Sequence, residues 1–492
     1  MINSQFYKRF FYYTLCIIPG LGFLIHHIKF AYFNVDEFQH TYLAWATTHF
    51  DMIQYRDMWD NHGILYTLFN SLILKIFQPE IGVPTIMLER YANLALLIIG
   101  FYILFEVFYE LSSKLHYASL GVFFFAYSGP ALKSIEVRPD NLQCVFLYAS
   151  ILLLFKALKT NNKQLSLVSG LFASLMLMTS LKSGIVLIGI GAGLVIGLLV
   201  KKDKKLFSLI LNFGIGIITG LIIFAIGFTY YGILDDYIKY NVIFNRLMTN
   251  LNLGSGSFQT LISCYGGRFL LVTISIFIAL GFFSRDAFND FQKQKYQKLI
   301  LVLIILFCLI ARFKYYFWVQ YDLLYYPICC FILSMMFLKL LELRQGKVLV
   351  LFVSSYLLLI GFVSFSILLN DFMIKKNYFS YIDKRFKDLN AYLKPNEYID
   401  YFNIGNCPGL GFNRNLSFLI HKYRQTTFLL EKLEQREIFG PSYIKELNSK
   451  RVRIIIGSPD GIGDNIYPET KKYIFKNYKY YNCIWERVTP FR

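Results

Sequence analysis

Two neighbouring carboxylates, Asp36 and Glu37, open a segment in which apolar or aromatic residues recur at positions 38, 42, 45 and 46. This spacing predicts an amphipathic helix that lies along a membrane interface, with the acidic pair at its N-terminus. A positioned carboxylate is able to remove a proton from a hydroxyl nucleophile. Helix dipoles also favour carboxylates in a first turn, so the pair taken alone is better explained as a helix start.

A second polar cluster follows in the segment 55–66, which reads Tyr-Arg-Asp-Met-Trp-Asp-Asn-His-Gly-Ile-Leu-Tyr. It places Arg56, two aspartates and His62 beside the predicted membrane surface. Such groups are expensive to keep near lipid without a role. The cluster therefore shifts the interpretation of the acidic pair from a simple helix start towards a functional site.

The elements that must hold these residues are membrane helices. Of the 492 residues, 56% are hydrophobic and only 16% are charged, which excludes a soluble domain organisation. Apolar runs of roughly 18 to 24 residues, long enough to cross a ~30 Å hydrocarbon core, recur along the chain. About eleven transmembrane helices are predicted, over 10–28, 87–110, 115–132, 139–157, 164–181, 184–200, 206–231, 268–283, 298–313, 322–338 and 347–369. The apolar stretch 64–77 is too short to be counted as a span.

The basic residues predict how the chain is oriented. The net charge of +19 resides largely in loops between apolar runs, which indicates a topology signal rather than a nucleic-acid surface. With a cytoplasmic N-terminus, every inside loop carries lysine or arginine, most densely at 201–205. The long loops 29–86 and 232–267 and the C-terminus then lie on the outer face.

From residue 371 onward the hydropathy falls, and a small extracytoplasmic α/β domain is predicted over 371–492. Its features are a buried strand at 453–457 and helical stretches at 382–393 and 427–437. Cys407 and Cys483 could form a disulfide if this region faces an oxidising compartment. The seven histidines are scattered without metal-ligand spacing, so the sequence predicts no metal site.

Asp36-Glu37 with the downstream pattern Tyr-Arg-Asp-x-x-Asp-x-His-x-x-Leu resembles the first periplasmic loop of GT-C glycosyltransferases. The likeness is to the bacterial branch that includes protein O-mannosyltransferases and lipid A aminoarabinose or galacturonic acid transferases. Further matching motifs are Val137-Arg138-Pro139-Asp140-Asn141, Lys182, and Gln320-Tyr321 ahead of Pro327. The sequence departs from relatives at Gly63-Ile64-Leu65, where Pro-Pro-Leu is common, and at His62, where some have lysine.

This resemblance implies a fold and a reaction. The fold is a polytopic GT-C module over 1–370, with the catalytic first periplasmic loop at 29–86, in a bacterial inner membrane. The reaction is inverting transfer of a sugar from a polyprenyl-phosphate donor to an envelope glycan, lipid A or a similar acceptor. Asp36 is the expected general base, Glu37 its neighbour or substitute, and Asp140 the second choice; Asp140 is equally well explained by an ion pair with Arg138. The expected substrate-contacting residues are Arg56, Asp60, His62, Arg138, Lys182, Gln320 and Tyr321. No cofactor is required, although a divalent cation is compatible with such a cavity.

Two other functions of the same topology stay open from sequence. A lipid-linked sugar flippase or transporter is expected to carry charges within its helices and to show two related halves. An O-antigen polymerase or ligase is expected to have a large central outer loop rich in arginine and histidine. In this chain, the charges concentrate in the first outer loop, and the loop 232–267 contains only Lys239 and Arg246 as basic residues.

Overall fold

The computed structural model is mostly helical. It describes residues 4–30, 35–58, 60–80, 82–246, 277, 280–281, 283–293, 295–314, 323–342, 399–401, 443–449, 451–456, 468–481 and 484–490. The chain divides into two compact units, of which the first comprises 1–31, 91–227 and 249–374. The second comprises 32–90, 228–248 and 375–492.

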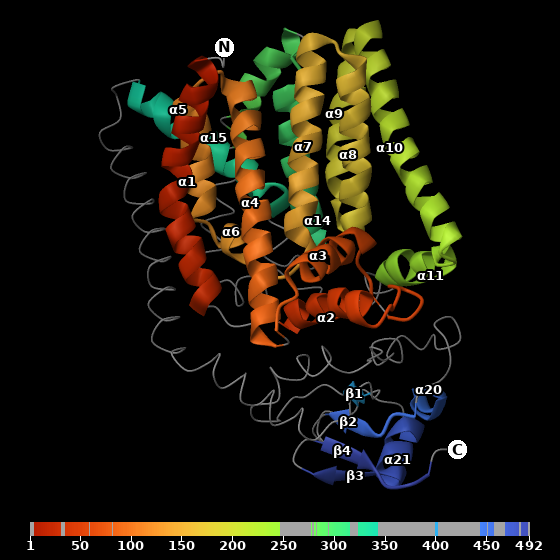
Figure 1. Ribbon diagram of the computed structural model, residues 1–492. Helices are drawn as coiled ribbons and strands as arrows, with labels where there is room; N and C mark the ends of the chain where they lie inside the picture. Colours follow the sequence, from red (N-terminus) through yellow and green to blue (C-terminus); the bar gives the residue numbers. More distant parts are fainter. Residues whose placement is uncertain are drawn as a thin grey trace. The chain divides into compact units, whose positions relative to one another are not determined.

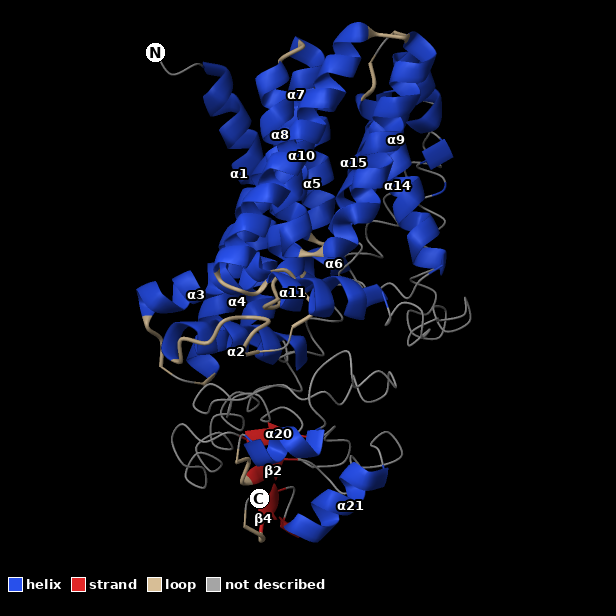
Figure 2. Ribbon diagram, turned by 90° about the vertical axis from the view of Figure 1, so that its right-hand side faces the viewer, coloured by secondary structure: helices blue, strands red, loops and turns tan. Residues whose placement is uncertain are grey.

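The first unit is built from long apolar helices that run side by side (Figures 1 and 2). They are α1 (Ser4–Phe30), most of α4 (Val83–Ser112), α5 (Leu115–Ala126), α7 (Pro139–Thr160), α8 (Lys163–Thr179), α9 (Gly184–Lys201), α10 (Lys204–Tyr230), α14 (Gln297–Lys314) and α15 (Tyr326–Glu342). Two short elements join them, α6 (Gly129–Lys133) after α5 and η1 (Leu181–Ser183) between α8 and α9. Helix α7 packs along α8, α9 packs along α14, and α5 contacts both α1 and α15. These contacts bury the apolar helix faces against one another.

Within the described residues, four helical segments are long and apolar enough to cross a membrane: Val83–Ser112, Pro139–Thr160, Leu181–Lys201 and Lys204–Tyr230. The two halves of α1 would make a fifth span; they are bent by 41° at a break that contains Pro19, which has no N–H for the helix. The remaining apolar helices are shorter. The chain is thus a membrane protein with four or five evident spans, and a total of eleven stays a prediction.

One predicted transmembrane helix does not form as a single continuous helix. The continuous helix expected over 115–132 is broken, because α5 ends at Ala126 and the short α6 begins at Gly129. Ser128 caps α6 by accepting a hydrogen bond from the N–H of Ala131, and Pro130 lies in its first turn, where a proline starts a helix rather than continuing one. The segment expected to end at 283 is helical over 283–292. The span expected over 347–369 lies outside the described residues.

Glycines let two helix pairs approach closely. A Cβ on Gly216 of α10 would lie 2.1 Å from the carbonyl oxygen of Leu167 on α8, and one on Gly170 of α8 would lie 2.1 Å from the carbonyl oxygen of Phe213. On α9, Gly189 and Gly193 face α14 with similarly little space. Small residues at four-residue spacing are how membrane helices pack backbone against backbone.

This packing predicts that alanine substitution at two glycines of α10 has different effects on the stability of the protein. Gly216→Ala is expected to destabilise the protein by about 1–3 kcal/mol, because the added methyl group meets backbone that cannot yield. Gly214→Ala is the matched control, since a Cβ there meets nothing within 4 Å. Thermal unfolding in detergent measures both. Equal unfolding temperatures for the two variants would show that α8 and α10 do not pack in this way.

In its parts 32–82 and 228–248, the second unit has these shorter helical elements among the described residues: α2 (Val35–His49), α3 (Ile64–Phe77), α11 (Leu234–Tyr237) and η2, a π-helix at Ile238–Ile243. Helix α2 packs against α3. A helix at α2 was predicted, but its expected one-sided amphipathic burial is wrong. Residues 40–46 are all buried, so α2 is covered on every side and its polar groups Glu37, His40 and Thr41 are enclosed.

Helix α3 covers 64–77, the short apolar stretch predicted from sequence. Its buried side carries Tyr66, Thr67 and Asn70, whereas Leu68 and Leu72 are exposed. Polar groups inside and apolar groups outside are the reverse of the pattern in a water-soluble helix. This distribution is what a helix against lipid requires.

The C-terminal residues form a four-stranded sheet in the order β1-β2-β4-β3. The strands are β1 (Ile399–Tyr401), β2 (Ile454–Ile456), β3 (Tyr478–Tyr481) and β4 (Ile484–Arg487), with helices α20 (Tyr443–Ser449) and α21 (Pro468–Asn477). β1 and β2 are parallel, and the other pairs are antiparallel. The strand predicted at 453–457 is confirmed as β2, and Ile454 and Ile455 are fully buried. The helices predicted at 382–393 and 427–437, together with Cys407 and Cys483, lie outside the described residues.

Candidate functional site

The acidic pair at the start of α2 is divided between two environments. Glu37 is fully buried, and its two carboxylate oxygens each accept a hydrogen bond from Arg90 of α4, at 2.7 Å from Nε and 2.7 Å from Nη2. One turn later on α2, Thr41 donates a hydrogen bond to the buried carboxyl group of Glu89. Asp36 is half-buried in the first turn of the same helix. Glu37 therefore anchors α2 to α4, and Asp36 is the more accessible carboxylate.

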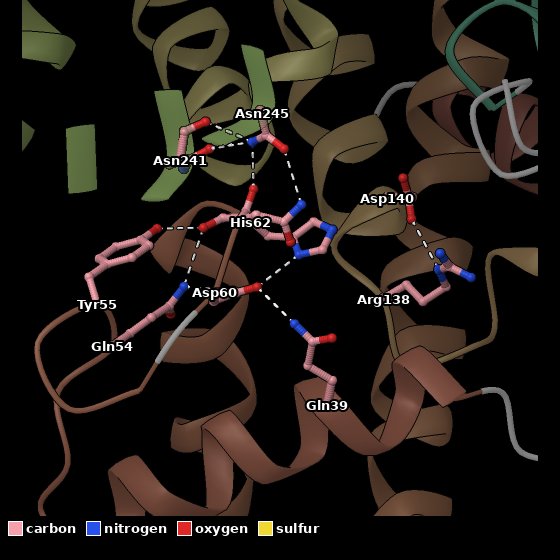
Figure 3. A network of polar contacts seen from close by, with 10 residues as sticks. Gln39, Gln54, Tyr55, Asp60, His62, Arg138, Asp140, Asn241 and Asn245 are labelled. Atoms are coloured by element: carbon pink, nitrogen blue, oxygen red, sulfur yellow. Dashed lines mark hydrogen bonds and ion pairs between the residues drawn. The ribbon is translucent and has the colours of Figure 1, made fainter. Parts of the chain in front are cut away.

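Asp60 is the centre of a polar network (Figure 3). Its Oδ1 accepts hydrogen bonds from Gln39 Nε2 at 3.1 Å and from His62 Nδ1 at 2.9 Å. Its Oδ2 accepts from Gln54 Nε2 at 2.8 Å. The carboxylate is buried and its oxygens are already occupied by protein donors. Burial and three orienting protein donors favour a positioning role for Asp60 over direct contact with substrate.

The backbone around His62 is held as firmly as its ring. The carbonyl oxygen of His62 accepts a hydrogen bond from Tyr55 Oη at 2.5 Å. Burial, together with the nearby Asp60 charge, raises the pKa of Tyr55 well above its usual value, so the hydroxyl keeps the proton that it donates. The Tyr55 ring meets Tyr237 edge to face at 5.4 Å, which connects the loop to α11.

The loop is also connected, through paired amides, to the residues that follow η2. Asn61 Nδ2 donates to Asn245 Oδ1 at 3.1 Å, and Asn245 Nδ2 donates to the carbonyl oxygen of Asn61 at 2.9 Å. Asn245 is itself held by the carbonyl oxygen of Asn241 at 2.7 Å. Residues separated by 184 positions in the sequence thus fix the turn that precedes α3 (Figure 3).

A separate ionic cluster lies in the first unit, at the start of α7. Arg138 lies between two acids, with its Nη1 at 3.5 Å from Glu136 Oε2 and its Nε at 3.5 Å from Asp140 Oδ2. Lys133 of α6 donates to Glu136 Oε1 at 2.5 Å. Asn93 of α4 donates to the carbonyl oxygen of Glu136 at 2.7 Å. The ion pair proposed from sequence between Asp140 and Arg138 is therefore present.

The remaining predicted residues are more dispersed. Arg56 is exposed and pairs with its neighbour Asp57, whose side chain raises the pKa of the guanidinium. Lys182 is exposed in η1, the single turn that joins α8 to α9. Gln320 and Tyr321 lie outside the described residues.

Sequence reasoning missed Arg90, Gln39 and Gln54. Arg90 could have been found from the sequence. A Glu-Arg pair near the start of an otherwise apolar predicted span is expected to form ion pairs inside the protein. The two glutamines could not have been found in this way, since nothing local distinguishes a glutamine that orients a carboxylate from one that faces water.

No protein-family model matches this chain, and no curated protein matches its sequence. Solved structures do match its fold. ArnT from Cupriavidus metallidurans, solved bound to undecaprenyl phosphate, aligns with a TM-score of 0.61 and 11% identity over 91% of this chain and 93% of that chain. The archaeal oligosaccharyltransferase AglB from Archaeoglobus fulgidus, solved with an inhibitory peptide and a dolichol-phosphate, aligns with a TM-score of 0.53 and 10% identity over 93% and 70%. Both are GT-C glycosyltransferases, so the predicted GT-C fold is confirmed.

Proposed function

We propose that this protein is an inverting glycosyltransferase that moves a sugar from a polyprenyl-phosphate donor to a glycan or glycolipid acceptor on the outer face of a bacterial inner membrane. The observation that carries the proposal is the fold match to ArnT, which covers nearly the whole of both chains. Both similar proteins were solved with a polyprenyl-type phosphate bound, undecaprenyl phosphate in one and a dolichol-phosphate in the other. Envelope glycans and lipid A are the acceptor classes that we expect.

In this proposal, Asp36 is the general base. An acceptor hydroxyl is a poor nucleophile until a positioned carboxylate removes its proton. Glu37 is poorly suited to that role, because Arg90 occupies both of its oxygens inside the protein. Asp36 is the neighbouring acid and is only half-buried. Asp140, in contact with Arg138, is the second candidate base.

Cations must stabilise the polyprenyl phosphate as it leaves with its negative charge. The candidates are Arg56, His62, Arg138 and Lys182. Arg138 is the most constrained of the three permanent cations, since two acids hold its guanidinium and its side chain is 11% exposed. The leaving group is a single phosphate on lipid, so the reaction itself does not require a metal ion.

The proposed topology places the N-terminus in the cytoplasm and the loop 29–86 on the periplasmic side, together with a C-terminal domain over 371–492. The polar network around Asp60 then faces the compartment in which the donor headgroup is presented.

The function is tested by incubating the purified chain in lipid vesicles with radiolabelled polyprenyl-phosphate sugars and bacterial envelope lipids. We expect the label to move to an envelope lipid and free polyprenyl phosphate to form in equal amount. The control is the same vesicle without protein. Donor that stays intact with every sugar and acceptor offered, while the protein remains folded, would contradict the proposal.

A further inference from the structure

We propose that His40, Asp60 and His62 bind one transition-metal ion, of which zinc is the expected occupant. The three residues come from α2 and from the loop before α3, and each offers a ligand atom within 4.8 Å of the other two. His40 and Asp60 are buried, and the His62 side chain is 18% exposed. The proposal rests on this ligand geometry and on the polar groups around it, and does not depend on sugar transfer.

The donor set selects the class of metal. Two imidazoles and one carboxylate suit zinc and related transition metals, whereas magnesium and calcium prefer oxygen ligands. Three protein ligands leave a further coordination position for water or a ligand oxygen. A divalent ion with one aspartate leaves a net charge of about +1 in an enclosed place, which would attract an anion.

The three ligand atoms must shift slightly before they can bind one ion together. Metal–ligand bonds of ~2.0–2.2 Å place the ligand atoms of a tetrahedral zinc ion roughly 3.3–3.6 Å apart. Asp60 Oδ1 and His62 Nδ1 are already 2.9 Å apart. His40, whose ligand atom lies within 4.8 Å of the other two, has to approach them, and the Asp60–His62 pair has to open slightly. Side-chain rotations supply both movements. Metal ions bind the deprotonated imidazole nitrogen, so the ion would take the place of the proton shared by His62 and Asp60.

The surroundings are arranged as the outer shell of a metal site. Gln39 and Gln54 donate to the Asp60 carboxylate, and Tyr55 and Gln54 donate to the backbone carbonyl of His62. Outer contacts of this kind orient the ligands of protein metal sites. Two of the three ligands are thus held in place before any ion binds.

A second observation points to an occupant beside Asp60. The Oε1 atom of Gln54 is buried and has no hydrogen-bond partner among the described residues. An unpaired buried carbonyl costs about 1–3 kcal/mol, and a bound water or ion is a common explanation. The same amide donates to Asp60 through its nitrogen, so this oxygen lies within one side-chain group of the proposed ligand set.

The competing explanation is that His40 only packs and that His62 only hydrogen-bonds Asp60. The rings of His40 and His62 meet edge to face at 4.8 Å, and His40 also meets the Tyr66 ring at 5.5 Å. Such contacts need aromatic rings but not imidazole nitrogens. Replacing His40 by phenylalanine keeps a ring in the packing and removes the ligand, so it separates the two explanations.

The experiment measures metal bound to the purified full-length chain. Protein stripped with a chelator is dialysed against Zn²⁺, desalted and analysed by mass spectrometry, and Co²⁺ is used as a spectroscopic probe of the ligand geometry. We expect the wild type to retain one more metal equivalent than His40→Phe, and His62→Gln to show the same loss. His49→Phe is the matched control, because His49 lies on the same helix but stacks on Trp45 and should retain the full amount.

The proposal is overturned if the wild type retains no more Zn²⁺ than His40→Phe or His62→Gln. It is also overturned if the His49→Phe control loses the same equivalent. Thermal unfolding with and without Zn²⁺ provides a second measurement, in which added Zn²⁺ should raise the unfolding temperature of the wild type and leave that of His40→Phe unchanged.

Discussion

An Asp36→Asn variant is expected to lose sugar transfer by about 10²–10⁴-fold, which is the usual contribution of a general base. Asparagine has nearly the same shape as aspartate but cannot accept the proton of the acceptor hydroxyl. The fold should be retained, because Asp36 is only half-buried and the helix start is also anchored by Glu37 and Arg90. Donor binding should therefore change little while the transfer rate falls.

The measurement compares the initial rate of transfer with the affinity for the polyprenyl-phosphate donor in the same vesicles. Asp51→Asn is the matched control, since Asp51 is exposed just beyond the other end of α2. Its backbone has a φ of 51°, a conformation that asparagine also adopts, so this variant should behave as the wild type. A folded Asp36→Asn protein that transfers at the wild-type rate would remove Asp36 from the role of base. That result would not contradict the proposed glycosyltransferase function, because the wild type would still transfer sugar.

Arg90→Met is expected to destabilise the protein by about 3–5 kcal/mol, because it leaves the Glu37 carboxylate buried without its cation. The Arg90 and Glu37 side chains are 2% and 0% exposed, so water cannot replace the lost partner. Thermal unfolding in detergent and the yield of monodisperse protein measure the effect.

Two comparisons make this prediction specific to a buried pair. Lys159→Met breaks an ion pair with Glu110 in which the lysine side chain is 60% exposed, and it should cost less than about 1 kcal/mol. The double variant Glu37→Leu with Arg90→Met removes both charges and should recover most of the loss, since apolar replacements of a buried pair are often neutral. If Arg90→Met were no more harmful than Lys159→Met, Glu37 would not be anchored as the structure indicates.

Much of the helical framework was predictable because its cause is local. An apolar run of sufficient length forms a helix in lipid, since every backbone N–H and C=O must be satisfied within the segment. The expected spans at 139–157 and 184–200 and the short helix at 64–77 correspond to α7, α9 and α3. The break between α5 and α6 was missed because the apolar run continues across Ser128 and Pro130, and hydropathy ignores caps and prolines.

The candidate site was predictable only as residue types in the right loop. Aspartates, arginine and histidine near the membrane indicated chemistry, and the two motifs around Asp36 and His62 indicated the GT-C fold that the structural comparisons confirm. Which carboxylate is accessible could not be predicted. Asp36 and Glu37 are adjacent and chemically similar, and they differ because Arg90, 53 residues from Glu37, binds both oxygens of Glu37 inside the protein, whereas Asp36 is only half-buried.

Sequence by itself thus determined a polytopic membrane chain and the segment in which its chemistry should lie, because hydropathy and residue type are properties of short stretches. The tertiary structure alone decided the partnerships: Glu37 with Arg90, Asp60 with Gln39 and His62, and His40 beside His62. These contacts form when distant segments bury polar groups together, and each buried group must find a partner wherever the fold places one. The spacing of residues along the sequence therefore does not show which of these buried polar groups pair.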